Sequence, residues 1–217
     1  MRQFGDTTTG AISKSRATCR RLTCNSGNIY IVTTMAAQLS WLMLAYKVPP
    51  DSPAKRIALW RRLKSLGAVY LQNGVCLFPK TAEHVRRLKV LANDVSDMGG
   101  AAFALETVGL DKSEEERVVA RFKADRDEQY KEFIGRCDDY EAEIAKERRT
   151  NKFTYAELDE EETDLKKMQS WLEKIRKLDF YGAPLAKEAE ARLRICEELL
   201  ESYAQQVFEA HEENRGE

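Results

Sequence analysis

The chain has 217 residues, enough for one domain of ordinary size, or two small ones, with a core that needs no disulfide or metal support. No apolar run approaches the roughly 20 residues needed to cross a membrane, and five scattered cysteines without a CxxC pair are typical of reduced thiols in the cytoplasm. The net charge is −1, yet residues 41–100 carry ten basic and four acidic side chains, whereas residues 101–217 carry 20 basic and 31 acidic ones. We therefore expect a soluble cytoplasmic protein whose N-terminal part is basic and whose C-terminal part is acidic.

Residues 1–38 are predicted to be a disordered N-terminal extension. Up to residue 34 they are rich in Ser, Thr and Arg, nearly free of acidic residues and without helical periodicity. A targeting peptide has this composition. The alternative is an upstream start codon, in which case the working chain begins at Met35. In both cases we expect a loosely packed or disordered segment.

Strand and helix signals follow each other from residue 39 onward. The apolar run 39–48 is expected to form a central strand buried on both faces, which Pro49-Pro50 ends. Ser52 is placed to cap the next helix, with Pro53 at its first position and Gly67 just past its end. The apolar face of this helix is expected to consist of Ile57, Leu59, Trp60, Leu63 and Leu66.

Two further strands and a second helix follow. The runs 68–72 and 75–78 flank Asn73-Gly74, which favours a type I′ hairpin turn with positive φ at both residues. Thr81 is placed to cap a helix that ends at Gly99-Gly100, and AAFALETV at residues 101–108 is the closing strand. The order β-α-β-β-α-β predicts a ferredoxin-like domain over residues 39–110, and hence an α+β fold class.

After Gly109 the apolar spacing changes to three and four residues, which indicates long helices. The stripe along residues 112–148 is broken only at Arg126, Thr154 and Glu157 form a capping box, and DFYGAP at 179–184 is a turn before the last helix. Helices with two apolar positions in seven bury their seams on each other. We therefore expect an antiparallel two- to three-helix coiled coil over residues 111–217.

Four separated blocks of sequence carry a family signal. They are WLMLAYKVPPDSPAKRIALWRRLKSLGAVYLQNGVCLFPKTAEHVRRL at residues 41–88, FKADR at 122–126, KFTYAEL at 152–158 and DFYGAP at 179–184. In this order they resemble the N-terminal domain of ChrB-type chromate-resistance proteins, over residues 39–205. The resemblance implies a regulatory or accessory protein. Full-length members of the family carry a second, C-terminal domain. The resemblance therefore leaves two alternatives, that any sensing by that domain is missing here or that a separately encoded partner protein supplies it.

The ferredoxin-like part is also similar to CRISPR spacer-acquisition nucleases and to the middle of PaaX-type repressors. In the nucleases an acidic residue near the end of the first strand binds metal. Here Lys47 stands in that stretch, and no carboxylate follows before Asp51. A lysine repels a metal ion, and the chain shows no carboxylate pair, Cys/His pair or glycine-rich phosphate loop. We therefore expect no enzymatic activity, no metal site and no cofactor.

Basic residues of the two helices within 39–110 are the best candidates for a functional surface. Lys and Arg neutralise phosphates irrespective of base sequence, and the resemblance to regulators favours DNA. Solvated helix faces also carry such residues for solubility, no helix-turn-helix is evident, and an oxyanion such as chromate is an alternative ligand of the arginines. The candidate nucleic-acid-binding residues are Lys55, Arg56, Arg61, Arg62, Lys64, Arg86, Arg87 and Lys89.

Other conspicuous residues are assigned structural places. His84 is expected at the surface, and the acidic run 157–164 is expected to be a solvated helix start that the helix dipole favours. The residues expected in the core are Cys76, Cys137, Cys196, Trp41, Trp60 and Trp171.

Two functions remain open from the sequence. The first is a chromate-resistance-type regulatory or accessory protein that binds DNA through the basic face of its ferredoxin-like half. The second is a non-enzymatic interaction module that docks a separately encoded partner domain. The expected partners are DNA or that partner protein, a homodimer is a further association to test, and no membrane partner is expected.

Overall fold

The computed structural model describes residues 38–49 and 53–213. Residues 39–217 form one compact unit. The predicted extension at residues 1–38, apart from its last residue, lies outside the described residues, and so does the predicted cap Ser52. Helix α1 (Pro53–Ser65) does begin at the expected proline.

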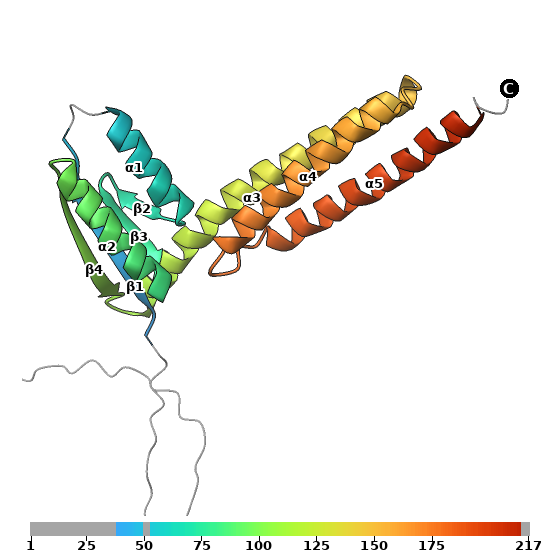
Figure 1. Cartoon of the computed structure of the whole chain (residues 1–217). Coiled ribbons are helices and arrows are strands. Elements are labelled where there is room, and N and C mark those ends of the chain that lie inside the picture. The colour runs from blue at the N-terminus through green and yellow to red at the C-terminus, as the bar shows by residue number, and fades with distance from the viewer. Residues whose placement is uncertain (1–37, 50–52, 214–217) are drawn as a thin grey trace, which may run out of the picture. The chain divides into compact units, whose positions relative to one another are not determined.

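The described residues contain a four-stranded antiparallel sheet in the order β2-β3-β1-β4 (Figure 1). Its strands are β1 (Ser40–Lys47), β2 (Val69–Gln72), β3 (Val75–Pro79) and β4 (Ala101–Val108). Helix α1 connects β1 to β2, and α2 (Ala82–Asp97) connects β3 to β4. The α+β fold class is confirmed, and this strand order is compatible with the predicted βαββαβ arrangement.

Strand β1 lies in the middle of the sheet, between β3 and β4. Its successive side chains point to opposite faces. Leu42 and Leu44 pack in one apolar cluster with residues of α1 and α2, so these two helices cover one face of the sheet. Trp41, which is 1% exposed, packs on the other face with Phe122 from the first long helix. The predicted central position of this strand is confirmed, but its expected burial on both faces is not, because Met43 and Ala45 on the second face are partly exposed.

The predicted apolar face of α1 is wrong at two positions. Leu59 and Leu63 are buried, but Ile57 and Trp60 are each 50% exposed. Residues three apart on an α-helix do not stay on one face, because each step of three drifts backward by about 60°. The pair four residues apart therefore faces the sheet, and Ile57 and Trp60 face solvent.

The β2–β3 hairpin forms at Asn73-Gly74, but the turn is not type I′. Gly74 has φ of 76°, whereas Asn73 does not adopt positive φ. The register shifts between Tyr70 and Gln72, which indicates a bulge, and a turn closed by a bulge needs a single left-handed glycine. A Cβ atom at position 74 would come within 2.4 Å of the Tyr46 carbonyl oxygen, so glycine is required there for packing as well.

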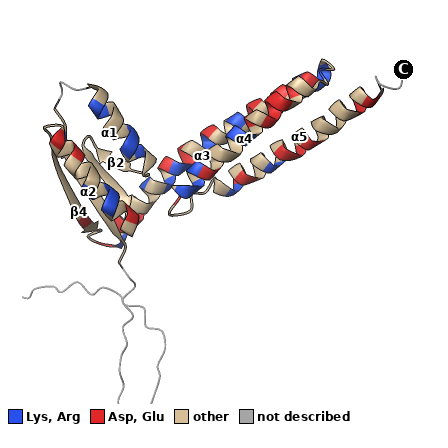
Figure 2. Cartoon of the chain, viewed as in Figure 1, with Lys and Arg blue, Asp and Glu red and all other residues tan. Residues whose placement is uncertain are grey.

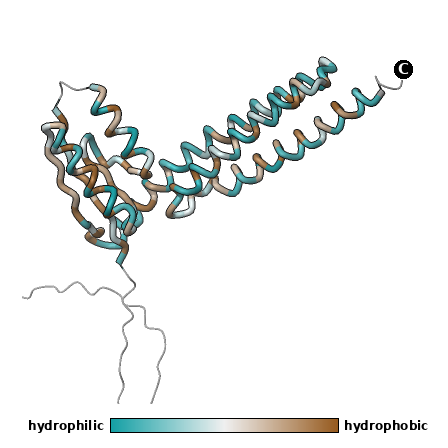
Figure 3. Tube along the Cα trace, viewed as in Figure 1, coloured by the Kyte–Doolittle hydropathy of each residue, from teal (hydrophilic) through white to brown (hydrophobic). Residues whose placement is uncertain are grey.

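Three long helices follow the sheet, α3 (Lys112–Arg149), α4 (Tyr155–Lys177) and α5 (Ala186–Glu213), and they share one apolar cluster. Apolar and polar positions alternate along α5, as expected for a helix with one buried stripe (Figure 3). Arg126, which interrupts the apolar stripe of α3, is itself only 2% exposed and is bonded to Asp125 and Gln129. A paired charge therefore continues the buried stripe where the sequence suggested a break.

The DFYGAP turn between α4 and α5 joins the helices to the sheet. Trp41 Nε1 donates a hydrogen bond of 2.9 Å to the hydroxyl of Tyr181, whose ring packs on Phe122. His84 was expected at the surface, but it is 6% exposed and lies edge-on to the Phe180 ring. It is buried because each ring nitrogen finds a partner, the Thr81 hydroxyl at 2.7 Å and the Leu66 carbonyl at 3.0 Å.

Replacing Leu63 by Ala is expected to lower the free energy of unfolding by about 2–5 kcal/mol, because it opens a cavity under α1. Replacing Ile57 by Ala on the same helix is expected to change it by no more than about 0.5 kcal/mol, since half of that side chain is exposed. Urea denaturation of both variants measures the difference. Equal losses would contradict the orientation of α1 described here.

Candidate nucleic-acid interface

Helix α1 is the most one-sidedly charged element of the described chain. All five of its ionisable residues are basic, and none of its residues is acidic. Helix α2 carries three basic residues, but Glu83, Asp94 and Asp97 balance them within the same helix. Figure 2 shows the contrast between α1 and the mixed charges of α3, α4 and α5. The surplus positive charge of the sheet half therefore lies on α1.

Ion pairs already engage three of the eight predicted residues. Arg62 pairs with Asp94 at 2.5 Å, Lys64 with Asp125 at 3.3 Å, and Arg87 with Glu83 at 3.5 Å. These pairs are partly or largely exposed, so each contributes little to stability. A phosphate can therefore replace the carboxylate as the partner of the basic side chain. Within the described residues, no ion pair engages the other five, which are Lys55, Arg56, Arg61, Arg86 and Lys89.

The two predicted basic clusters meet at one place. Arg62 of α1 and Arg87 of α2 line the same small groove, of about 140 Å³, between the two helices. Arg86 and Lys89 are exposed on α2 but do not line this groove. The structure thus links α1 and α2 through one pair of arginines, and α1 carries most of the candidate surface.

An aromatic residue stands among the unpaired cations of α1. Trp60 lines a surface hollow of about 320 Å³ with Pro53, Arg56 and Ile57. We call the exposed set Lys55, Arg56, Ile57, Trp60 and Arg61, which spreads over about 240° of the helix circumference, the α1 outer face. Sequence reasoning placed Trp60 in the core and so missed this feature. The sequence does contain a pattern that predicts the exposure of Trp60. Leu59 and Leu63 are four residues apart and define a buried face that excludes residue 60.

The β2–β3 hairpin forms the wall beside the α1 outer face. Trp60 and Arg56 also line a hollow of about 450 Å³ with Tyr46, Asn73 and Gly74. The Tyr46 and Tyr70 hydroxyls lie 3.4 Å apart, and burial is the main cause that raises the pKa of both. Both phenols therefore stay neutral and can donate hydrogen bonds, so this wall adds no negative charge next to the arginines.

The described residues show neither a metal centre nor a membrane span. Among residues 38–49 and 53–213, no three His, Cys, Asp or Glu side chains are grouped so that they could hold a metal ion. Within the same ranges, no helix is both long and apolar enough to cross a bilayer. The predicted core thiols Cys76, Cys137 and Cys196 are all buried, as expected.

Comparison with known proteins gives the family. The family model described as "Protein ChrB, N-terminal" matches residues 56–214. The chain is 27% identical over 161 residues to "Protein ChrB" of Cupriavidus metallidurans, a match that covers 72% of this chain and 45% of that protein. No solved structure matches the chain. The chain belongs to the ChrB N-terminal family, and it spans about half the length of the curated relative that it matches.

Trp60 is expected to account for most of the tryptophan fluorescence that iodide can quench. Trp41 is 1% exposed and Trp171 is only partly exposed, whereas half of Trp60 is in contact with solvent. Replacing Trp60 by Phe should therefore remove the larger part of the quenchable emission, measured as the slope of a quenching plot. The matched control, Trp171→Phe, should leave that slope nearly unchanged, and the reverse order would contradict the exposed position of Trp60.

Proposed function

We propose that this chain is a chromate-resistance-type regulatory or accessory protein that binds DNA through the α1 outer face. The observation that carries the proposal is a set of three cations, Lys55, Arg56 and Arg61, that form no ion pair within the described residues and lie on a helix without acidic residues. Such groups neutralise phosphates and release bound counterions, which drives sequence-independent binding. The groove between Arg62 and Arg87 extends the same charge toward α2.

The exposed indole of Trp60 gives the surface a second kind of contact. Aromatic side chains beside basic residues stack on unpaired bases, and each such stack contributes about 1–3 kcal/mol. Trp60 is half exposed and shares its hollow with Arg56, so a base on the indole would leave a phosphate near the guanidinium. Binding to single-stranded or locally opened DNA follows from this pairing.

We propose that the chain acts in the cytoplasm as a binding protein and not as an enzyme. A thiol reductant of chromate must reach its substrate as a thiolate. Cys76 is fully buried, and burial raises the pKa of its thiol to about 12. Cys137 and Cys196 are also fully buried, between α3 and α5. These positions support a structural role for the three thiols.

DNA binding can be tested by charge removal. The triple variant Lys55→Ala, Arg56→Ala, Arg61→Ala is expected to bind labelled DNA more weakly. The slope of log affinity against log salt should become less steep by about 1 for each phosphate contact that is lost. Fluorescence anisotropy across a salt series measures both quantities. Trp60→Ala should weaken single-stranded binding more than duplex binding.

The matched control removes the same charge from the helical part, with Lys131→Ala, Lys174→Ala and Lys187→Ala. These lysines are exposed and, within the described residues, form no ion pair. The control is expected to keep the affinity and salt slope of the unmodified chain. Equal losses in both triple variants, or no binding to DNA even at low salt, would contradict the proposal.

A second candidate function, docking of a separately encoded partner domain, is supported by the open side of the sheet. Phe103 and Leu105 on β4 are 66% and 50% exposed. They pair with Ala45 and Met43 of β1, so they lie on the face that α1 and α2 do not cover. Strand β4 is also an edge strand, and exposed apolar edges commonly serve as protein-binding surfaces.

Docking can be tested with Phe103→Ser and Leu105→Ser. These substitutions are expected to abolish co-elution with the separately encoded domain in size-exclusion chromatography, while circular dichroism stays unchanged. Val90→Ser on α2 is the matched control, because Val90 is 53% exposed and lies on the other side of the sheet. Retained co-elution in the β4 variants would exclude this face as the docking site.

A further inference from the structure

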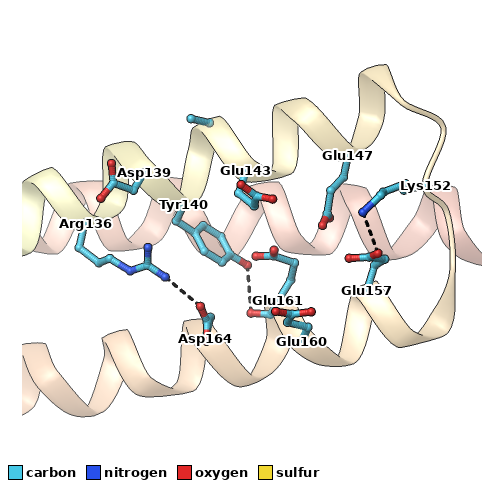
Figure 4. A pocket seen from close by; sticks show the side chains of 11 residues that line it. Arg136, Asp139, Tyr140, Glu143, Glu147, Lys152, Glu157, Glu160, Glu161 and Asp164 are labelled. Carbon is cyan, nitrogen blue, oxygen red and sulfur yellow. Dashed lines mark hydrogen bonds and ion pairs between the residues drawn. The ribbon is translucent and has the colours of Figure 1, made fainter.

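An acid-lined cavity of about 660 Å³ lies between α3 and α4, near the link that joins the two helices (Figure 4). Seven carboxyl groups line it against two cations, Arg136 and Lys152. The principal acids are Asp139, Glu143 and Glu147 on α3, and Glu157, Glu161 and Asp164 on α4. The acidic run 157–164 was expected to be a solvated helix start. Glu161 corrects this expectation, because it is only 6% exposed.

The helical repeat explains why the acids gather. Asp139, Glu143 and Glu147 are four residues apart, so they form a row on one side of α3 with a little more than one turn, roughly 6 Å, between them. Glu157, Glu161 and Asp164 form a similar row on α4. Figure 4 shows the two rows facing each other across the cavity. The arrangement is therefore a double line of carboxylates.

The cations of the cavity do not reach its middle. Lys152 pairs with Glu157 at 3.0 Å at one end, and Arg136 pairs with Asp164 at 2.8 Å at the other. Between these pairs lie Glu147 and Glu161, which no cation of the described residues contacts. Once these two carboxyl groups are ionised, no cation of the described residues neutralises them.

Glu147 is the group that points to a ligand. It is 2% exposed and its side chain is directed into the cavity, where it contacts the carboxyl group of Glu157 (Figure 4). Its Oε2 atom receives no hydrogen bond from any of the described residues. The nearby Tyr203 hydroxyl donates its one proton to the Lys152 carbonyl oxygen, at 2.5 Å. Tyr140 likewise donates to the main-chain oxygen of Glu161, at 3.3 Å. A buried carboxylate oxygen without a donor is costly unless a cation or a proton occupies the site.

We propose that this cavity binds a linear polyamine, whose ammonium groups pair with Glu147, Glu161 and the carboxylates in line with them. Three or four methylene groups separate neighbouring ammonium groups of a linear polyamine by roughly 5–6 Å, which is close to the roughly 6 Å between acids four residues apart on a helix. A bare metal ion fits less well, because the described residues hold no group of three ligands placed for one. A flexible cation with several donors matches two parallel rows of acceptors.

The titration of the cavity supports a role for cations. Burial is the main cause that raises the pKa of Glu147 to about 7, and the neighbouring Glu157 adds to it. Burial also raises the pKa of Glu161 to about 7, with Glu147, Asp164 and Glu143 next in effect. The other titratable groups that act on them or lie beside them are Lys152, Glu157, Glu160, Tyr203 and Tyr140.

The sign of the pH dependence follows from these shifts. In the folded chain both carboxyl groups keep their protons up to about pH 7, whereas in the unfolded chain they lose them near 4.5. The folded state then binds more protons in that window, so their contribution to stability falls as the pH rises from about 4.5 to 7. A polyamine needs the ionised carboxylates, so its affinity should rise over the same range.

Isothermal titration calorimetry with spermidine on the full chain, at about pH 8 and moderate salt, tests the proposal. Saturable binding is expected, and the variant Glu147→Gln, Glu161→Gln should weaken it at least tenfold. Without ligand, this variant should melt at a higher temperature than the unmodified chain at the same pH, because charge repulsion is removed. The matched control, Glu198→Gln with Glu201→Gln, removes two exposed carboxylates from α5 and should change neither result.

Three outcomes would overturn the proposal. The first is the absence of saturable spermidine binding to the unmodified chain. The second is an equal loss of affinity in the control variant, which would indicate unspecific screening of the acidic helices. The third is saturable binding of Mg²⁺ at matched ionic strength that is as tight as that of spermidine and depends on Glu147, which would identify a metal site instead.

Discussion

The structure depends on the aromatic contact that holds the sheet against the long helices. Trp41 lies on the central strand, its indole donates to Tyr181, and Phe122 of α3 packs on the same tyrosine. On the other side of the sheet, Phe180 packs on His84 and lies next to Gly67, where a Cβ atom would be 3.4 Å from its ring. Two neighbouring residues of one turn therefore contact both sides of the sheet half, which explains why the sheet and the long helices belong to one compact unit.

Because the sheet and the long helices are packed together, the basic and the acidic surfaces keep separate places in one unit. A basic α1 and an acid-lined cavity between α3 and α4 belong to the same packed unit. Charges of opposite sign stay apart because α3 is a continuous helix from the sheet to the cavity, and its buried residues fix both ends. The two surfaces suit ligands of opposite charge, phosphates on α1 and ammonium groups in the cavity.

Local signals predicted much of the fold. Thr81 and Thr154 each accept a hydrogen bond from the main chain three residues on, as their cap positions required. The closing strand and the buried seams of the long helices also follow from periodicity. The burial of individual side chains against other elements could not be predicted from these local signals. His84 is buried because a carbonyl from α1's end meets its ring, and Trp60 is exposed because the sheet lies on the opposite side of its helix. In the sequence the acids of α4 could be recognised only as the acidic run 157–164, because the acids that face them across the cavity belong to α3.

The central claim is that the contacts of Tyr181 and Phe180 make the sheet and the helices one cooperative unit. Equilibrium unfolding followed by two probes tests it most directly. In a Trp171→Phe variant, fluorescence reports on Trp41 and Trp60 of the sheet half, while far-ultraviolet circular dichroism reports mainly on α3, α4 and α5. Coincident transitions are predicted. Separate transitions, with the helices unfolding independently of the sheet, would contradict the account.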